Sequence, residues 1–303
     1  MLLHISSPTI EQVLAFHALH PKKPLNVLLS FASPKIEFEE FQKLHRKKVC
    51  SLILDSGAYT LNKSAWAKRP KNILQAYANF CKRSAKYYDF SFNLDEDFSI
   101  HGFDANMYNQ LDLEENELNP VPVVHSLDTA EDSEIARLSK MDYDLIAIGQ
   151  CQGGRPFSKL RPAVHKICDG GKRNVHLFGV TELNILQELP IWSCDSSSWA
   201  QYVKFGQVMW WNDANADWNP WEVIYFPKKQ VEHDPSKGRN YWDYRFKDQF
   251  DQYIKTNLNI TIDHLLGGKK ELYRGLVNIF FFKEMERRVT EYHRDVKKFI
   301  FPE

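Results

Sequence analysis

Short apolar runs alternate with segments of helical periodicity over most of the chain. Seven runs have the length and composition of buried strands, at residues 25–31, 51–54, 88–94, 121–124, 145–148, 175–178 and 191–194. A last strand is expected at 208–211 or at 223–226. The segments between them, such as 72–85 and 181–189, repeat apolar residues at the spacing of an amphipathic helix. Successive strand-then-helix units predict an α/β protein with a (β/α)8 TIM barrel, and an open doubly wound sheet is the alternative.

The pattern changes after residue 227. A polar connector containing proline and glycine follows, and then two helical segments at about 240–256 and 269–299. We therefore expect two domains, a barrel at 1–227 and a C-terminal helical extension at 228–303 that packs on it.

Polar residues or glycines come directly after the predicted strands. They are Asp55, Asp95, Glu96, His125, Gly149, Gln150, Gly179 and Asp195. A single aspartate after a strand is more often a helix N-cap than a catalyst. Parallel barrels, however, build their active sites at the carboxyl ends of successive strands. The whole series therefore predicts an active site, although no single member does.

Composition and charge narrow the class of protein. The chain has 303 residues, and its 39 basic and 39 acidic residues give no formal net charge, which argues against a generic polyanion binder. The five cysteines are widely spaced and form no CxxC pair, so no disulfide framework or cysteine zinc site is expected. The N-terminus is too polar for a signal peptide, and the longest apolar run near the tail is too short to span a bilayer. We expect a soluble cytoplasmic protein without a membrane partner.

Carboxylates that converge from different strands suit glycosidic chemistry. One carboxylate attacks or stabilises the anomeric carbon, and another moves the proton of the leaving group. Tyr59 and Phe178 would add flat surfaces for a planar ring, and a third carboxylate can bind the N–H edge of a guanine-like base. The residues alone predict a barrel that acts on a glycosidic bond and accommodates an aromatic base.

Six segments occur in the order and approximate spacing of a known motif series. They read "DSGAYT", "FNLDED", "VVHSL", "IAIGQCQGGRP", "HLFGVTELNILQEL" and "SCDSSSW". This series resembles the tRNA-guanine transglycosylase (queuine tRNA-ribosyltransferase) superfamily. It is most similar to the shorter 7-deazaguanine DNA transglycosylases of phages and bacterial modification islands.

The resemblance implies a role for each matching residue. Asp195 would be the nucleophile at C1′ of the target guanosine, and Asp55 would be the general acid/base. Asp95 would hydrogen-bond the base, between Tyr59 on one side and Phe178 with Gly179 on the other. The remaining base-binding positions would be His125 and the backbone around Gly149, Gln150 and Cys151.

Departures from the tRNA enzymes favour DNA as the substrate. His125 stands where those enzymes carry glutamine, and Gln150 stands where they carry a second glycine, so the base pocket is altered; the preference for DNA comes from two missing segments. Their CxCxxC…H zinc site and the PTR sequence after the nucleophile are both missing. The resemblance thus implies a barrel without a zinc subdomain, in which guanine in DNA is exchanged for a 7-deazaguanine (a preQ0-like base) through a covalent Asp–sugar intermediate. It requires neither a metal nor an organic cofactor, and it would serve restriction evasion in the host cytoplasm if the protein is phage-encoded.

Other possibilities stay open. The substrate could be tRNA, which is less favoured, or the chain could be a non-catalytic family member that only binds a base or nucleic acid. An unrelated barrel glycosidase acting on sugars ranks last. A homodimer is possible. The basic tail and the tryptophan-rich stretch at 209–221 would either contact nucleic acid or pack as ordinary structure.

Overall fold

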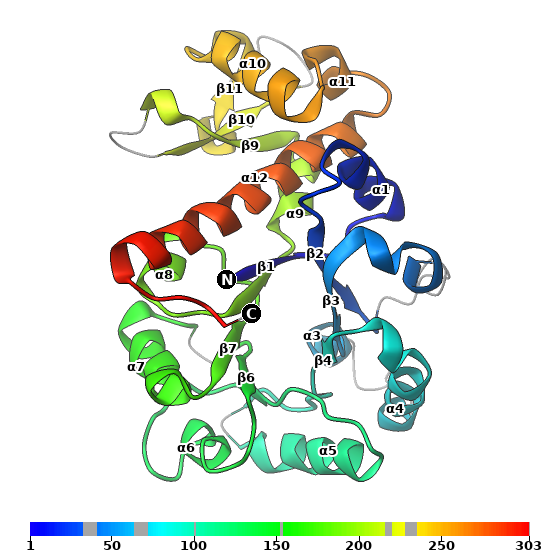
Figure 1. Cartoon of the computed structure of the whole chain (residues 1–303), viewed down its shortest axis with the longest axis vertical. Helices are drawn as coiled ribbons and strands as arrows, with labels where there is room; N and C mark the ends of the chain where they lie inside the picture. Colours follow the sequence, from blue (N-terminus) through cyan, green and yellow to red (C-terminus); the bar gives the residue numbers. More distant parts are fainter. Residues whose placement is uncertain are drawn as a thin grey trace. The chain divides into compact units, whose positions relative to one another are not determined.

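Eight parallel strands form a closed barrel in the computed structural model (Figure 1), which describes residues 1–32, 41–63, 72–99, 101–151, 154–215, 220–227 and 235–302. The strands are β1 (Leu2–Ser6), β2 (Leu25–Ser30), β3 (Val49–Asp55), β4 (Phe90–Ser91), β5 (Val123–Val124), β6 (Leu145–Ile148), β7 (Asn174–Leu177) and β8 (Ser193–Ser196). Their order is β4-β3-β2-β1-β8-β7-β6-β5. A parallel bridge between Phe92 and Val121 joins the two outer strands, and the Val121 amide donates to the Ser91 carbonyl at 2.7 Å. The predicted (β/α)8 fold class is confirmed, and the open doubly wound sheet is excluded.

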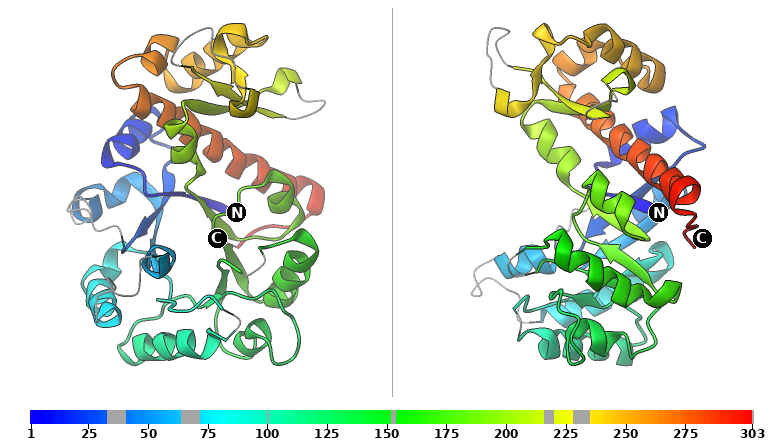
Figure 2. Two further views of the ribbon diagram at one scale, coloured as in Figure 1. Left: turned by 180° about the vertical axis from the view of Figure 1, so that it is seen from behind. Right: turned by 90° about the vertical axis from the view of Figure 1, so that its left-hand side faces the viewer.

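Helices connect the strands as the periodicity predicted. They are α1 (Ile10–Leu19), α3 (Ala58–Lys63), α4 (Ile73–Ser84), α5 (Phe103–Glu115), α6 (Glu134–Leu138), α7 (Phe157–Cys168) and α8 (Leu183–Glu188). Figures 1 and 2 show α4 to α7 on the outside of the strands. Helix α4 buries Tyr77, Ala78 and Cys81 in a cluster with Leu54 of β3, so apolar residues on one helix face cover the outer side of the sheet.

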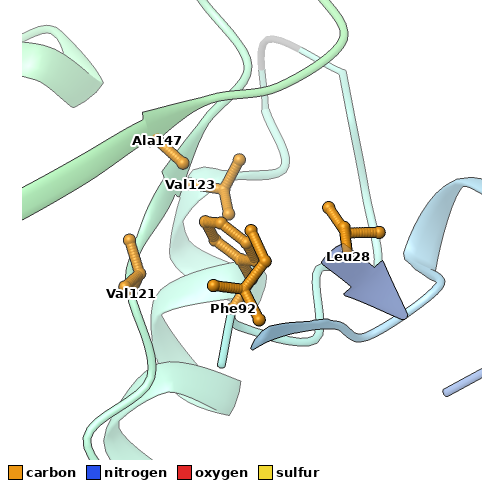
Figure 3. Close-up of a cluster of buried hydrophobic side chains, with 6 residues drawn as sticks. Leu28, Phe92, Val121, Val123 and Ala147 are labelled. Carbon is orange, nitrogen blue, oxygen red and sulfur yellow. The ribbon is translucent and has the colours of Figure 1, made fainter. Parts of the chain in front are cut away.

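One layer of the barrel interior is hydrophobic. Its buried members are Leu28, Ile53, Phe92, Val121, Val123 and Ala147, of which five are labelled in Figure 3. Because side chains alternate along a strand, residues two positions further on face the same interior. On β1, β7 and β8 the interior is polar instead, with His4, His176 and Ser193 all fully buried.

Contacts divide the chain into two compact units. The first comprises 1–7, 26–196 and 288–303, and the second comprises 8–25 and 197–287. The second unit thus includes residues 197–227, which the sequence had grouped with the barrel. A compact unit is not the same as a separately folding domain, so the expected domains at 1–227 and 228–303 stay a prediction.

A three-stranded sheet forms part of the second unit. It contains β9 (Gln207–Trp211), β10 (Trp221–Tyr225) and β11 (Arg239–Asn240), accompanied by α9 (Ser198–Lys204), α10 (Lys247–Leu258), α11 (Ile262–Leu266) and α12 (Lys270–Tyr292). The expected last barrel strand at 208–211 or 223–226 is therefore wrong, because both segments belong to this sheet. The missing barrel strand is β1, whose inward-facing His4 weakens its apolar pattern.

The two adjacent tryptophans of β9 are core residues. The ring of Trp210 packs against Phe250 of α10, with centroids 5.6 Å apart. The ring of Trp211 stacks on Phe281 of α12 at 4.9 Å, because consecutive strand residues point to opposite faces. Both are buried, so ordinary packing accounts for them, whereas residues 216–219 of this stretch lie outside the described residues. Among the described helices, none is long and apolar enough to cross a membrane.

Candidate functional site

A cavity of about 410 Å³ lies within the first unit, where the barrel strands end, and its size is typical of small-molecule sites. The predicted site residues that line it are Asp55, Tyr59, Asp95, His125, Gly149, Gln150, Phe178 and Gly179. Two predicted residues do not line it. Asp195 contacts the cavity wall through Gly179, and Cys151 is buried behind the wall.

The alternation of the strands brings several of these side chains together. Asp55, His125 and Gly149 each lie two residues beyond a member of the hydrophobic layer, namely Ile53, Val123 and Ala147. They therefore form the next layer toward the carboxyl ends of β3, β5 and β6.

Asp55 has an acidity suited to proton transfer. Burial raises its pKa to about 6, and the neighbouring carboxylates of Asp195 and Asp95 act in the same direction. Hydrogen bonds from the Gly57 backbone and the Ser30 hydroxyl oppose this rise without cancelling it. A carboxyl group with such a pKa can both give and accept a proton near neutral pH.

Gly57 allows the tight turn after Asp55. Its φ of +77° lies in the left-handed region, and an added Cβ would lie 2.2 Å from the Ala32 Cβ and 2.8 Å from the Ser30 Oγ. We expect Gly57→Ala to cost about 1–3 kcal/mol of unfolding free energy from backbone strain, with the collision adding to it. Chemical denaturation would measure the loss, and Gly170→Ala, which has a left-handed φ but open space around its Cβ, is the matched control. Equal losses in the two variants would contradict a role for the close approach.

Asp195 is held as a buried carboxylate. The Ser6 hydroxyl donates to its Oδ2 at 2.7 Å, and the Gly179 amide donates to its Oδ1 at 2.9 Å. Burial acts to raise its pKa, but His176, Ser6 and Gly179 together outweigh burial, so the pKa lies below its usual value. Asp55 and Asp195 are thus driven in opposite directions, which is how neighbouring carboxyls acquire acid/base and anionic roles.

Asp95 and His125 form a buried pair beside the cavity. Asp95 Oδ2 lies 3.1 Å from His125 Nε2, while Asp95 Oδ1 accepts a hydrogen bond from Asn93 Nδ2 at 2.8 Å. His125 Nδ1 lies 2.9 Å from the Gln150 carbonyl oxygen, which can only accept, so Nδ1 carries a hydrogen. In a neutral His125, the lone pair of Nε2 would then face a lone pair of the Asp95 carboxylate and repel it. A proton held between Nε2 and the carboxylate oxygen removes this repulsion.

The pKa values agree with a shared proton. Burial alone would lower the pKa of His125, but Asp95 raises it above the usual value. Burial raises the pKa of Asp95. Both shifts favour retention of one proton between the two residues.

This pairing predicts a strong coupling between the two side chains. His125→Leu should cost about 3–5 kcal/mol of unfolding free energy at pH 7, because it leaves the Asp95 charge buried without its partner. Denaturation of His125→Leu, Asp95→Asn and the double variant measures the coupling. The double variant should be more stable than His125→Leu alone, and simple additivity of the two losses would contradict the pairing.

Aromatic rings and one cysteine complete the predicted set. The Phe178 ring packs against Phe92 with centroids 4.5 Å apart, whereas Tyr59 is exposed at the cavity. Burial raises the pKa of the Cys151 thiol to about 11, so it is neutral and is not a nucleophile. Among the described residues, no group of three or more His, Cys, Asp or Glu could hold a metal ion.

Several residues of the site were not predicted. They include Phe92, Asn93, Phe98 and Arg155 on the cavity wall, and His176 behind it. Arg155 Nη1 donates to the Phe178 carbonyl at 2.6 Å and to the Gly149 carbonyl at 3.3 Å, which ties two strand ends together. The sequence carries a signal for His176, since it is a lone polar residue in the apolar run at 175–178.

The fold and the site together define a (β/α)8 barrel with an acidic cavity at its strand ends. No protein-family model matches the sequence, and no curated protein matches it. A solved structure described as a "putative fructose-1,6-biphosphate aldolase" from Coccidioides immitis is 15% identical. The match covers 67% of this chain and 76% of that one, with a TM-score of 0.44, and similarity at this level carries no argument about function.

Proposed function

We propose that this protein is a DNA-guanine transglycosylase, which replaces guanine in DNA with a 7-deazaguanine derivative. The observation that carries the proposal is the pair formed by Asp55 and Asp195. One carboxyl has a pKa raised to about 6 and the other has a lowered pKa, and the Asp195 carboxylate is one of the groups that raise the pKa of Asp55. A retaining base exchange needs one anionic nucleophile and one acid/base group.

In the first step Asp195 attacks C1′ of an extruded guanosine. The C1′–N9 bond breaks, the carboxylate oxygen forms an ester with the sugar, and the protonated Asp55 gives its proton to the departing guanine. Extrusion is required because stacking in a duplex hides C1′ and the base. The charge of Asp195 disappears into the ester, and Asp55 becomes a carboxylate.

In the second step the incoming base reverses this sequence. Asp55 accepts the proton from N9 of the 7-deazaguanine, N9 attacks C1′, and Asp195 leaves as a carboxylate. Two inversions at C1′ give net retention. Both steps balance with the protein's own carboxyl groups and need no oxidant, reductant or metal.

The base would occupy the cavity beside Asp95. With the shared proton on His125, Asp95 is an ionised acceptor at the cavity wall and suits the N–H edge of a guanine-type base. Phe178 and Tyr59 also line this cavity and provide apolar surface for a planar ring. The preference for DNA over tRNA rests on the missing zinc and PTR sequences.

Base exchange in vitro tests the proposal. The protein is incubated with guanine-containing DNA or with tRNA, together with 7-cyano-, 7-aminomethyl- or 7-amidino-7-deazaguanine. The polymer is then digested to nucleosides, which are identified by mass. A modified deoxynucleoside supports the proposal. A modified ribonucleoside would move the substrate to tRNA, and no exchange on either polymer by folded protein would favour a barrel that only binds.

A further inference from the structure

His176 lies directly beneath Asp195 in the polar part of the barrel interior. It is fully buried on β7, with its Nδ1 2.8 Å from the Ser193 Oγ and its Nε2 3.6 Å from the Asp195 Oδ1. The rings of Phe92 and Phe178 pack against the imidazole with centroids 4.7 and 4.6 Å away. These contacts fix the position of the ring between a hydroxyl and a carboxylate.

The two neighbours determine which nitrogen carries the hydrogen. An ionised carboxylate can only accept, whereas a serine hydroxyl can donate or accept. The favoured tautomer therefore has its hydrogen on Nε2 facing Asp195, while Nδ1 accepts from the Ser193 hydroxyl. Burial lowers the pKa of His176, so the ring is neutral near pH 7.

His176 Nε2 has an unused capacity to donate. Among the described residues it makes no hydrogen bond, and 3.6 Å is too long for one. A buried donor without a partner is costly, and catalytic hydrogen bonds often tighten only when substrate is bound. A small movement of the Asp195 carboxylate toward His176 would complete the bond.

We propose that His176 is a positioning residue, whose neutral Nε2–H, set by Ser193, keeps Asp195 ionised and oriented for attack. The contact between His176 and Asp195 is a feature of the structure, whereas a role in nucleophilic attack rests on the proposed function. No proton is transferred from His176. Its N–H stabilises the anion before attack and again when Asp195 leaves C1′, when the same negative charge returns.

Other groups around Asp195 also influence its ionisation. Ser6 of β1 and the Gly179 amide donate to the carboxylate, the Arg155 guanidinium favours its charge, and the Asp55 carboxyl opposes it. The neighbouring His4 is occupied elsewhere, with its Nε2 3.0 Å from the Ser51 Oγ. His176 is thus the nearby imidazole that faces Asp195.

The test measures the ionisation of Asp195 directly. Protein labelled with ¹³C at the aspartate carboxyls is titrated by NMR, and the Asp195 signal is identified by its loss in Asp195→Asn. His176→Leu should raise the pKa of Asp195 by about one pH unit, equal to a tenfold weaker preference for the anion. His176→Gln, whose side-chain amide can still donate, should recover most of the shift, and Ser193→Ala should give an intermediate value.

The pH profile of base exchange is the second readout. Asp55 sets the pH dependence near 6, so loss of activity through protonation of Asp195 is expected only at lower pH. That lower limb should move upward in His176→Leu in parallel with the Asp195 titration, while His176→Gln stays near the wild-type profile. An unchanged pKa of Asp195 in folded His176→Leu would overturn the proposal. If the leucine variant does not fold, an unchanged pKa of Asp195 in both His176→Gln and Ser193→Ala would overturn it. If wild-type protein exchanges no base at all, the proposed function fails, whereas the NMR titration still decides whether His176 controls Asp195.

Discussion

Asp195→Asn should abolish base exchange, with a loss of at least about 10³-fold, because an amide oxygen is a poor nucleophile and cannot restore the sugar ester. The fold should survive, since the asparagine Oδ1 can still accept from the Gly179 amide and its Nδ2 can donate to the Ser6 hydroxyl. Nucleoside mass analysis measures the exchange, and the thermal unfolding midpoint reports the fold.

The matched control for this variant is Asp169→Asn. Asp169 is an exposed carboxylate at the end of α7 whose partner is Lys172, so its replacement should leave exchange unchanged. Exchange by Asp195→Asn at a rate comparable to the wild type would remove Asp195 from the reaction.

Asp55→Asn should lower the rate of exchange by about 10²–10⁴-fold, the usual contribution of a general acid/base. The wild-type rate should also depend on pH near 6. The step that takes up the incoming base should slow as pH falls through about 6, because the carboxylate needed to accept its proton is lost. This dependence should disappear in Asp55→Asn, and a wild-type profile that stays flat from pH 5 to 7.5 would contradict the assignment.

The same substitution should stabilise the protein. The pKa of Asp55 is about 6 in the folded chain against an ordinary 3.8, so the folded state binds the proton more tightly than the unfolded state. Stability is therefore lost as pH rises from about 4 to 6. At pH 7 Asp55→Asn should gain about 1–3 kcal/mol, and at pH 3.5 it should gain nothing. Equal effects at both pH values would argue that titration of Asp55 is not the cause.

The fold was predictable where strand patterns were apolar. The residues of the hydrophobic layer identify β2 to β6 as strands in the sequence. Strands β7 and β8 also contain enough apolar residues to be recognised as strands. Strand β1 was missed because its central residue is His4, which lies in the polar part of the barrel interior and interrupts the apolar pattern. The sequence instead predicted β9 or β10 as the eighth barrel strand, because both are apolar. Their pairing in a separate three-stranded sheet is a tertiary feature that the local pattern does not show.

The site was predictable for a related reason. Residues that end strands, such as Asp55 and Gly149, reach the cavity by strand alternation alone. Arg155 could not be found in this way, because it lies in the segment between β6 and α7 and not at a strand end. The tautomer of His125 and the opposite acidities of Asp55 and Asp195 are properties of packed neighbours, and they required the structure.

Trapping the covalent intermediate tests whether Asp195 is the nucleophile. Wild-type protein is mixed with guanine-containing DNA in the absence of an incoming base and quenched in acid. It is then separated under denaturing conditions and digested for peptide mass analysis. We expect release of free guanine and a sugar-linked DNA adduct on the peptide that carries Asp195, with neither product in Asp195→Asn. Guanine release without an adduct, or an adduct on another residue, would contradict it.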